Sequence, residues 1–117
     1  MNLILHITTH SDWETAVSHP PYTTASLQSD GFIHCSTPAQ AVYAANEHFK
    51  GQTGFKLLCI DEDLVTAKVV YEDCYETGLK FPHIYGPLNL DAVTAVLPFP
   101  PDADGRFTRL PENTPGG

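Results

Sequence analysis

The chain has 117 residues, with 14 acidic and six basic side chains and a formal net charge of −8 at pH 7. This balance argues against a nucleic-acid partner, because phosphate neutralisation needs clustered Lys and Arg, and both arginines, Arg106 and Arg109, lie near the C-terminal end. The length is that of one domain, large enough to bury roughly two thirds of its unfolded surface without a metal or disulfides.

The cysteines and the apolar segments indicate the compartment. Cys35, Cys59 and Cys74 are odd in number, far apart and in no Cys-x-x-Cys pair, which is typical of reduced thiols. Residues 1–7 are too few for a signal peptide and lack its basic start, and no apolar run approaches the roughly 20 residues of a spanning helix. We therefore expect a cytoplasmic protein without a membrane partner.

The first predicted elements are a strand and a short helix. Apolar and polar residues alternate over residues 3–8, which predicts a strand with His6 and Thr8 on one face. Ser11 and Glu14 have the spacing of a capping box and predict a helix of about two turns that ends before a Pro-Pro pair. The residues between that pair and the next strand are predicted to form a polar connection.

A second strand and a longer helix follow. Residues 32–35 alternate between two faces and place His34 at the end of a short strand. Thr37 and Gln40 then form a second capping box, which predicts a helix over residues 38–49. The free N–H groups and positive dipole end of that helix would lie beside His34, where they favour an anion.

Three later strands are predicted by their apolar and β-branched content and by flanking turn residues, over residues 55–60, 68–71 and 92–97. Between the last two, glycines and prolines interrupt the string from Phe81 to Leu88, which predicts a positioned loop that holds His83 and Tyr85.

These elements define an α+β fold, with small mixed, mainly antiparallel sheets and two short-to-medium helices in a single domain over residues 1–97. Residues 98–117 are rich in Pro and Gly and are predicted to form a partly extended or mobile tail, with Phe99 or Phe107 docking on the domain.

Three histidines, His6, His34 and His83, lie on predicted strands or rigid turns and are the main candidates for chemistry. Each alone could equally be a half-buried histidine whose ring N–H bonds a carbonyl. A zinc site is a further alternative, but the spacings lack the short pairs that make a metal prediction strong, so no metal ligand is assigned.

Other side chains near these histidines receive smaller roles. Ser36 is interpreted as a ligand-binding hydroxyl, since no Gly-x-Ser-x-Gly elbow is present. Cys35 alternates to the strand face opposite His34, which makes a Cys-His nucleophile pair geometrically poor. The acids nearest the predicted site are Glu72, Asp73 and Glu76, and one of them could orient a histidine or act as a base, although acidic turns are usually just solvated.

Three strings of residues closely resemble the DUF952 family, small bacterial and plant proteins of unknown function. The strings are Leu5-His6-Ile7-Thr8, Asp30-Gly31-Phe32-Ile33-His34-Cys35-Ser36-Thr37 and Phe81-Pro82-His83-Ile84-Tyr85-Gly86-Pro87-Leu88. The resemblance extends over about residues 2–97. It implies a fold like that of the ADP-ribosyltransferases, in which two small, mainly antiparallel sheets pack across a cleft.

The same resemblance implies roles for particular residues. The segment around His6 is similar to the first-strand His-Gly-Thr motif of poly-ADP-ribosyltransferases and RNA 2′-phosphotransferases, whose histidine bonds a ribose hydroxyl of NAD. His34 corresponds to the region of the tyrosine that stacks on nicotinamide. Two departures are visible: Ile7 replaces the motif glycine, and the catalytic glutamate has no clear counterpart, with Glu72 as a substitute. The essential arginines of the phosphotransferases are absent.

The leading hypothesis is a cleft that binds a small nucleotide-like or NAD-like ligand. The candidate ligand-binding residues are His6, Thr8, Ser36, Gln40 and Tyr85, and the candidate catalytic residues are His34, His83 and Glu72. If the protein is an enzyme, the resemblance favours a glycosidic or phosphoryl transferase. The alternative is a non-catalytic protein-interaction module, in which the histidines and aromatic residues only rigidify the fold. The sequence leaves the oligomeric state open.

Overall fold

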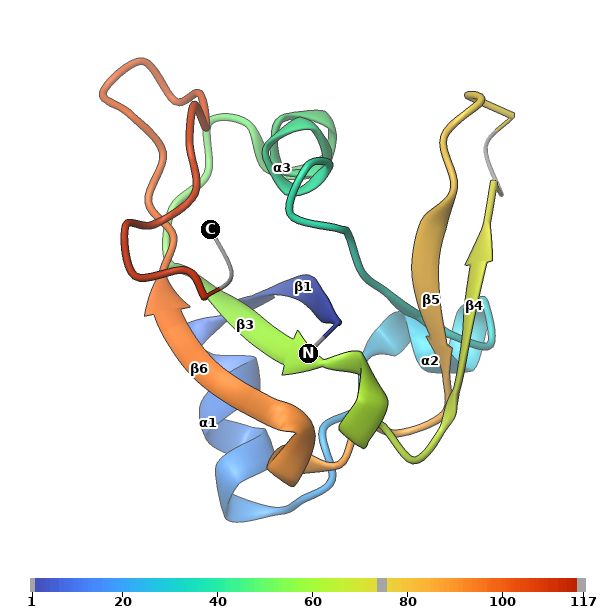
Figure 1. The fold of residues 1–117 in the computed structure, drawn as a ribbon. Helices are drawn as coiled ribbons and strands as arrows, with labels where there is room; N and C mark the ends of the chain where they lie inside the picture. Colours follow the sequence, from blue (N-terminus) through green and yellow to red (C-terminus); the bar gives the residue numbers. More distant parts are fainter. Residues whose placement is uncertain (1, 74–75, 116–117) are drawn as a thin grey trace.

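The computed structural model describes residues 2–73 and 76–115. The elements in chain order are β1 (Leu3–Thr9), α1 (His10–Ser18), α2 (Ala25–Ser29), β2 (Ile33–His34), α3 (Ala41–Phe49), β3 (Phe55–Asp61), β4 (Lys68–Glu72), β5 (Phe81–Tyr85) and β6 (Val93–Pro98), with 3-10 turns η1 (Glu62–Leu64) and η2 (Leu90–Ala92). They form two antiparallel three-stranded sheets, ordered β1-β3-β6 and β2-β5-β4. The α+β prediction is thereby confirmed, with three helices instead of two (Figure 1).

The sheet β1-β3-β6 is covered by apolar groups on both faces. On β3, Leu58 and Ile60 belong to one buried cluster, while Leu57 and Cys59 belong to another on the opposite face. This two-sided burial explains why the sequence of β3 is a nearly continuous apolar run instead of an alternating one. His6 of β1 is also buried on this sheet.

The two sheets are joined where the chain leaves β2. In β2, Ile33 lies opposite Ile84 and His34 lies opposite His83. Two residues later Ser36 pairs with β1, since its N–H donates to the Leu5 carbonyl at 2.8 Å and its carbonyl accepts the Leu5 N–H at 2.7 Å. The chain thus passes from one sheet to the other within three residues.

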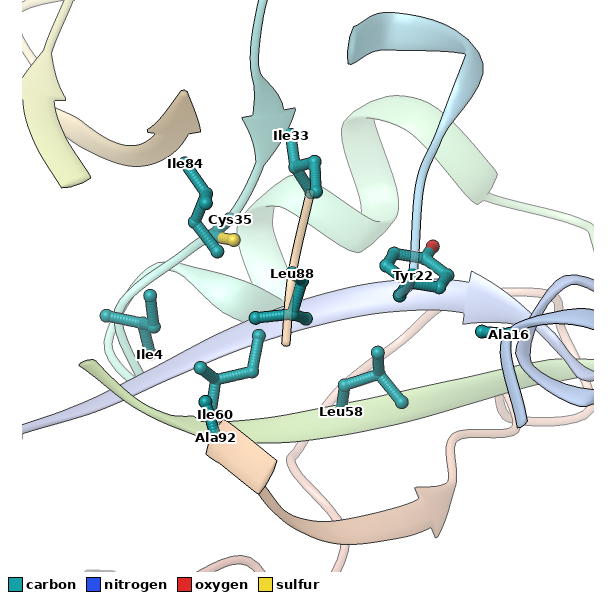
Figure 2. Packing of buried hydrophobic residues seen from close by; sticks show 10 residues of the cluster. All are labelled: Ile4, Ala16, Tyr22, Ile33, Cys35, Leu58, Ile60, Ile84, Leu88 and Ala92. Carbon is teal, nitrogen blue, oxygen red and sulfur yellow. The ribbon is translucent and has the colours of Figure 1, made fainter. Parts of the chain in front are cut away.

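The larger buried cluster fills the space between the sheets. In Figure 2, Leu88 lies at its centre, with Ile33 and Ile84 of the second sheet on one side and Leu58 and Ile60 of the first sheet on the other. All five side chains are fully buried. The core therefore holds the second sheet at a fixed position relative to the first.

The short helices differ in detail from the prediction. Thr9, and not Ser11, caps α1, because its Oγ1 accepts the Asp12 N–H at 3.2 Å. α1 ends at Ser18, before the prolines, as predicted. The predicted polar connection contains α2, whose cap is Thr24. With five residues and no apolar periodicity, α2 has no sequence signal beyond that cap.

α3 begins at Ala41, three residues later than predicted. Half of the predicted capping box forms, since Gln40 Oε1 accepts the Thr37 N–H at 3.1 Å. The Thr37 carbonyl accepts the N–H groups of Gln40 and Ala41, which makes residues 37–40 a turn before the helix. The end at Phe49 agrees with the prediction.

The predicted loop around His83 is in fact β5, the central strand of the second sheet. The extended conformation was correct, but the proline did not prevent pairing. Pro82 lies opposite Tyr71, and its carbonyl accepts the Cys35 N–H at 3.0 Å. A proline lacks a donor but keeps its acceptor, so it fits a strand position where only its carbonyl is used.

Residues after β6 pack on the face of the first sheet that α3 also covers. Phe99 and Phe107 are buried in one cluster with Leu5 and Ala45. Asn46 of α3 fixes the backbone of Phe107 from both sides, because its Nδ2 donates to the Phe107 carbonyl at 2.7 Å and its Oδ1 accepts the Phe107 N–H at 2.8 Å. Both aromatic side chains thus dock on the domain.

Candidate functional site

One face of the sheet β2-β5-β4 carries half of the candidate side chains. The register places His34 opposite His83, and period-two alternation puts Tyr85 on the same face as His83. The His34 and His83 rings are 5.4 Å apart between centroids. Phe32 stacks on His83 at 3.9 Å with 14° between the planes and contacts His34 edge-on at 4.8 Å. The sheet therefore brings together two histidines that are 49 residues apart in sequence.

Glu72 is hydrogen-bonded to His83. The Nδ1–H of His83 donates to Glu72 Oε1 at 2.8 Å, and the Tyr85 hydroxyl donates to the same oxygen. The hydrogen bonds from Tyr85 and His83 lower the pKa of Glu72, so its carboxylate form is favoured. His83 is almost completely buried, while Glu72 is partly exposed at the edge strand. Tyr85 and His83 are thus tied to one anionic oxygen.

His34 forms a second histidine–carboxylate pair. Its Nε2 lies 3.1 Å from Asp30 Oδ2, and its side chain is 35% exposed, compared with 1% for His83. Asp30 directly follows α2 as its C-terminal cap, and its N–H donates to the Ser26 carbonyl. His34 is therefore the more accessible of the two imidazoles.

His6 has both ring nitrogens engaged within the protein. Its Nδ1–H donates to the His34 carbonyl at 2.5 Å, and its Nε2 lies 2.7 Å from the Tyr22 hydroxyl, which is 2.8 Å from Thr8 Oγ1. Burial lowers the pKa of His6 to about 4, so the ring is neutral at pH 7. With the ring hydrogen on Nδ1, Nε2 accepts from Tyr22, and the Thr8 hydroxyl is then the donor at the remaining contact.

A cleft of about 820 Å³ opens beside these groups. Five of the predicted site residues line it, namely His6, Thr8, His34, Ser36 and His83. Its other walls come from the start of α1, the start of α2, the middle of α3 and the segment before β5. The side chains that these walls contribute include Asp12, Thr24, Tyr43, Glu47, Thr77 and Phe81.

Three predicted site residues lie outside the cleft lining. Glu72 and Tyr85 do not line the cleft, but both are linked to His83, since Glu72 Oε1 accepts hydrogen bonds from His83 and from the Tyr85 hydroxyl. Gln40 uses both ends of its amide in the fold, with Oε1 on the Thr37 N–H and Nε2 donating to the Lys80 carbonyl at 2.7 Å. Gln40 therefore ties the chain before β5 to the start of α3.

Sequence reasoning missed Asp30 and Glu47 and gave Phe32 no role at the site. The i, i+4 spacing of Tyr43 and Glu47 on α3 was a usable signal, since their hydroxyl and carboxylate oxygens are 3.2 Å apart. The same spacing of Asp30 and His34 was not, because these residues do not lie on a helix. The contact between Tyr22 and His6 has no local signal.

Within residues 2–73 and 76–115, no three His, Cys, Asp or Glu side chains converge in a way that could hold a metal ion. In the same part of the chain, no helix has the length and apolar character needed to cross a membrane.

The protein is a small α+β domain built from two antiparallel sheets that pack on a common core. His34 and His83, from strands of one sheet, line its cleft. The chain belongs to the DUF952 family, described as proteins of unknown function, whose sequence model matches residues 7–96. No curated protein matches the chain.

Solved structures of a relative have the same architecture. The crystal structure of protein CC0527 from Caulobacter crescentus is 32% identical, with a TM-score of 0.81, 91% of this chain and 93% of that chain being covered. A crystal structure of a double mutant of CC0527 gives the same values. The solution NMR structure of CC0527 has a TM-score of 0.79 at 32% identity, with 92% and 93% covered.

Proposed function

We propose that the cleft binds a small nucleotide-like or NAD-like ligand and that His34 and His83 are the imidazoles that act on it. The observation that carries the proposal is the placement of two histidine–carboxylate pairs, Asp30–His34 and Glu72–His83, with rings 5.4 Å apart at one wall of an 820 Å³ cleft. A purely structural histidine needs no such duplicated pair.

The pairs suit general acid–base chemistry. A carboxylate beside an imidazole orients the ring and stabilises the imidazolium that forms when the ring takes up a proton. In a glycosidic transfer, the bond from ribose C1′ to a ring nitrogen breaks and its electron pair leaves with the heterocycle. An acceptor hydroxyl forms the new bond at C1′, and its proton passes to an imidazole. His34 and His83 are assigned to this proton transfer, with Asp30 and Glu72 as positioning residues.

A relation to the ADP-ribosyltransferase fold is part of this proposal. It is supported by the two antiparallel sheets that meet where Ser36 pairs with β1, next to the cleft. One detail differs from the contact that the resemblance implies. Because Tyr22 occupies His6 Nε2, a ribose hydroxyl reaches that nitrogen only by replacing the tyrosine hydroxyl. His6 and Thr8 are therefore assigned to the wall of the site, and His34 to direct contact.

Calorimetric titration with NAD, ADP-ribose and nicotinamide tests the proposal. We expect heat with at least one of them, and a loss of at least about tenfold in affinity in His34→Ala. His19→Ala, a histidine outside the cleft, is the matched control. Absence of heat with all three ligands, and with the riboside of nicotinamide as well, overturns the proposal. A stability loss in His34→Ala and His83→Ala, with ligand affinity unchanged, favours the interaction module instead.

A further inference from the structure

The charges that surround the cleft are all negative or balanced. Among the described residues that line it, the fixed charges are the carboxylates of Asp12 and Glu47, and no Lys or Arg contributes to the wall. Both carboxylates are on exposed positions of α1 and α3. The chain as a whole carries a net charge of −8, which adds to the negative potential at the cleft.

Of the four histidines that line the cleft, three are buried or paired with a carboxylate, and the fourth, His48, directly follows Glu47 on α3. His6 is buried and neutral, with a pKa lowered to about 4 by burial. His34 and His83 each lie within 3.1 Å of a carboxylate oxygen, Asp30 Oδ2 and Glu72 Oε1 respectively. Protonation of either ring therefore gives a neutral ion pair and not a site of net positive charge.

The N-terminal ends of the helices do not supply positive charge to the cleft in place of Lys or Arg. The start of α3 is not at the cleft, which meets α3 at Tyr43, Ala44, Glu47 and His48, and the N–H groups of Gln40 and Ala41 bind the Thr37 carbonyl. The start of α1 does line the cleft, but the Asp12 N–H is taken by Thr9 Oγ1 and the Asp12 carboxylate sits there. The start of α2 lines the cleft as well, but the Leu27 N–H is bound by Thr24 Oγ1 at 3.2 Å and Ser26 Oγ donates to the Phe32 carbonyl at 2.8 Å. The helix start at which the sequence places an anion, that of α3, does not line the cleft.

One aromatic ring on the cleft wall, that of Tyr43, has the exposure and the neighbouring charge that a flat cation would need. Tyr43 is 45% exposed on α3, next to Glu47, whose carboxylate accepts its hydroxyl. A positively charged heterocycle over the Tyr43 ring would gain both a cation–π contact and the attraction of Glu47. A phosphate in the same space would meet Asp12 and Glu47 without a compensating donor of positive charge.

We infer that the ligand is a cationic N-ribosylated heteroaromatic compound without a phosphate group, held with its charged ring near Tyr43 and Glu47. This inference rests on the proposed function and narrows its ligand class. It also favours glycosidic over phosphoryl transfer, because no Lys or Arg among the described lining residues is placed to stabilise a transferring phosphoryl group.

The test compares nicotinamide riboside, which carries one positive charge, with nicotinamide mononucleotide, which adds only a phosphate. We expect the riboside to bind about tenfold or more tightly than the mononucleotide. Glu47→Gln should weaken riboside binding by roughly two- to fivefold and reduce the preference. Glu112→Gln, an exposed carboxylate outside the cleft, should change neither affinity.

The outcomes separate this inference from the proposed function. If the mononucleotide or NAD binds as tightly as the riboside, or more tightly, the charge argument is wrong while a nucleotide-binding cleft remains. If Glu47→Gln leaves the riboside affinity unchanged, the placement of the cation is wrong. If none of these compounds binds, both proposals fail together.

Discussion

His34 and His83 face each other across neighbouring antiparallel strands, and Phe32 contacts both rings. A single aromatic side chain therefore sets the positions of two imidazoles, one almost fully buried and one a third exposed. Because each imidazole also has its own carboxylate, its orientation is fixed from two directions. This arrangement leads to predictions that do not depend on the identity of a ligand.

Phe32→Ala should destabilise the protein by about 3–4 kcal/mol, because Phe32 is buried and its ring forms the stacking surface of His83. Phe32→Leu should recover part of the loss, since it keeps the apolar volume without the ring face. Urea denaturation measures both. Equal stability of Phe32→Ala and the parent protein would show that the stacked arrangement contributes nothing.

Below pH 6.5 stability should fall because of His6. The pKa of His6 in the folded protein is lowered to about 4, so between pH 6.5 and 4 the unfolded chain binds more protons than the folded one. The free energy of unfolding should decrease by up to about 3 kcal/mol as pH falls through this window. His6→Gln removes the titrating group, and its stability should be flatter over the same range. A parallel pH profile for the two proteins would contradict this account.

Glu72→Gln should change how the free energy of unfolding depends on pH in the acid range. The pKa of Glu72 is lowered in the folded state, so its stabilising effect is complete above the ordinary value of 4.5 and is lost as pH falls below it. The variant should be less stable than the parent at pH 7, and the difference should shrink towards pH 3. Tyr85→Phe removes one of the two donors and should reproduce part of the effect. Urea unfolding at stepped pH measures these differences, and a pH-independent difference would contradict the linkage.

Leu88→Ala should destabilise the protein by about 2–5 kcal/mol, because Leu88 is fully buried between the two sheets. Leu64→Ala is the matched control, since Leu64 in η1 is half exposed and its loss should cost less than about 0.5 kcal/mol. Thermal unfolding compares the two. Similar losses for both would mean that the contact between the sheets is not the stabilising element.

The strands that bury one side or both were predictable from sequence, because their apolar pattern records burial. β1, β3 and β6 were found within a residue or two, as was the end of α3. The start of α3 was misplaced because the Thr37 and Gln40 pattern stabilises a turn as readily as a first helical turn. The sequence predicts a loop at β5 because Pro82 lies within it. Only the pairing with the neighbouring strands shows that the sheet does not need the N–H that Pro82 lacks.

The candidate site was predictable in its residue types but not in its partners. The convergence of His34 and His83 follows from strand register, which no local pattern specifies. The sequence names Glu72 and His83 as candidates without pairing them, and it gives Asp30 no role at the site, because an acidic residue before a Gly looks like an ordinary turn residue. Gln40 was assigned to the ligand, but its amide is used by Thr37 and Lys80, contacts that depend on where β5 begins.

The backbone pairing of Leu5 with Ser36 has a mechanical consequence. His34 is only two residues from this anchor, and its carbonyl also holds the ring of His6. A ligand that moved the backbone at His34 would therefore also have to move β1, so this wall of the cleft should be rigid. Ligands that already fit the shape of the cleft should therefore bind more tightly than ligands that require the cleft to change shape.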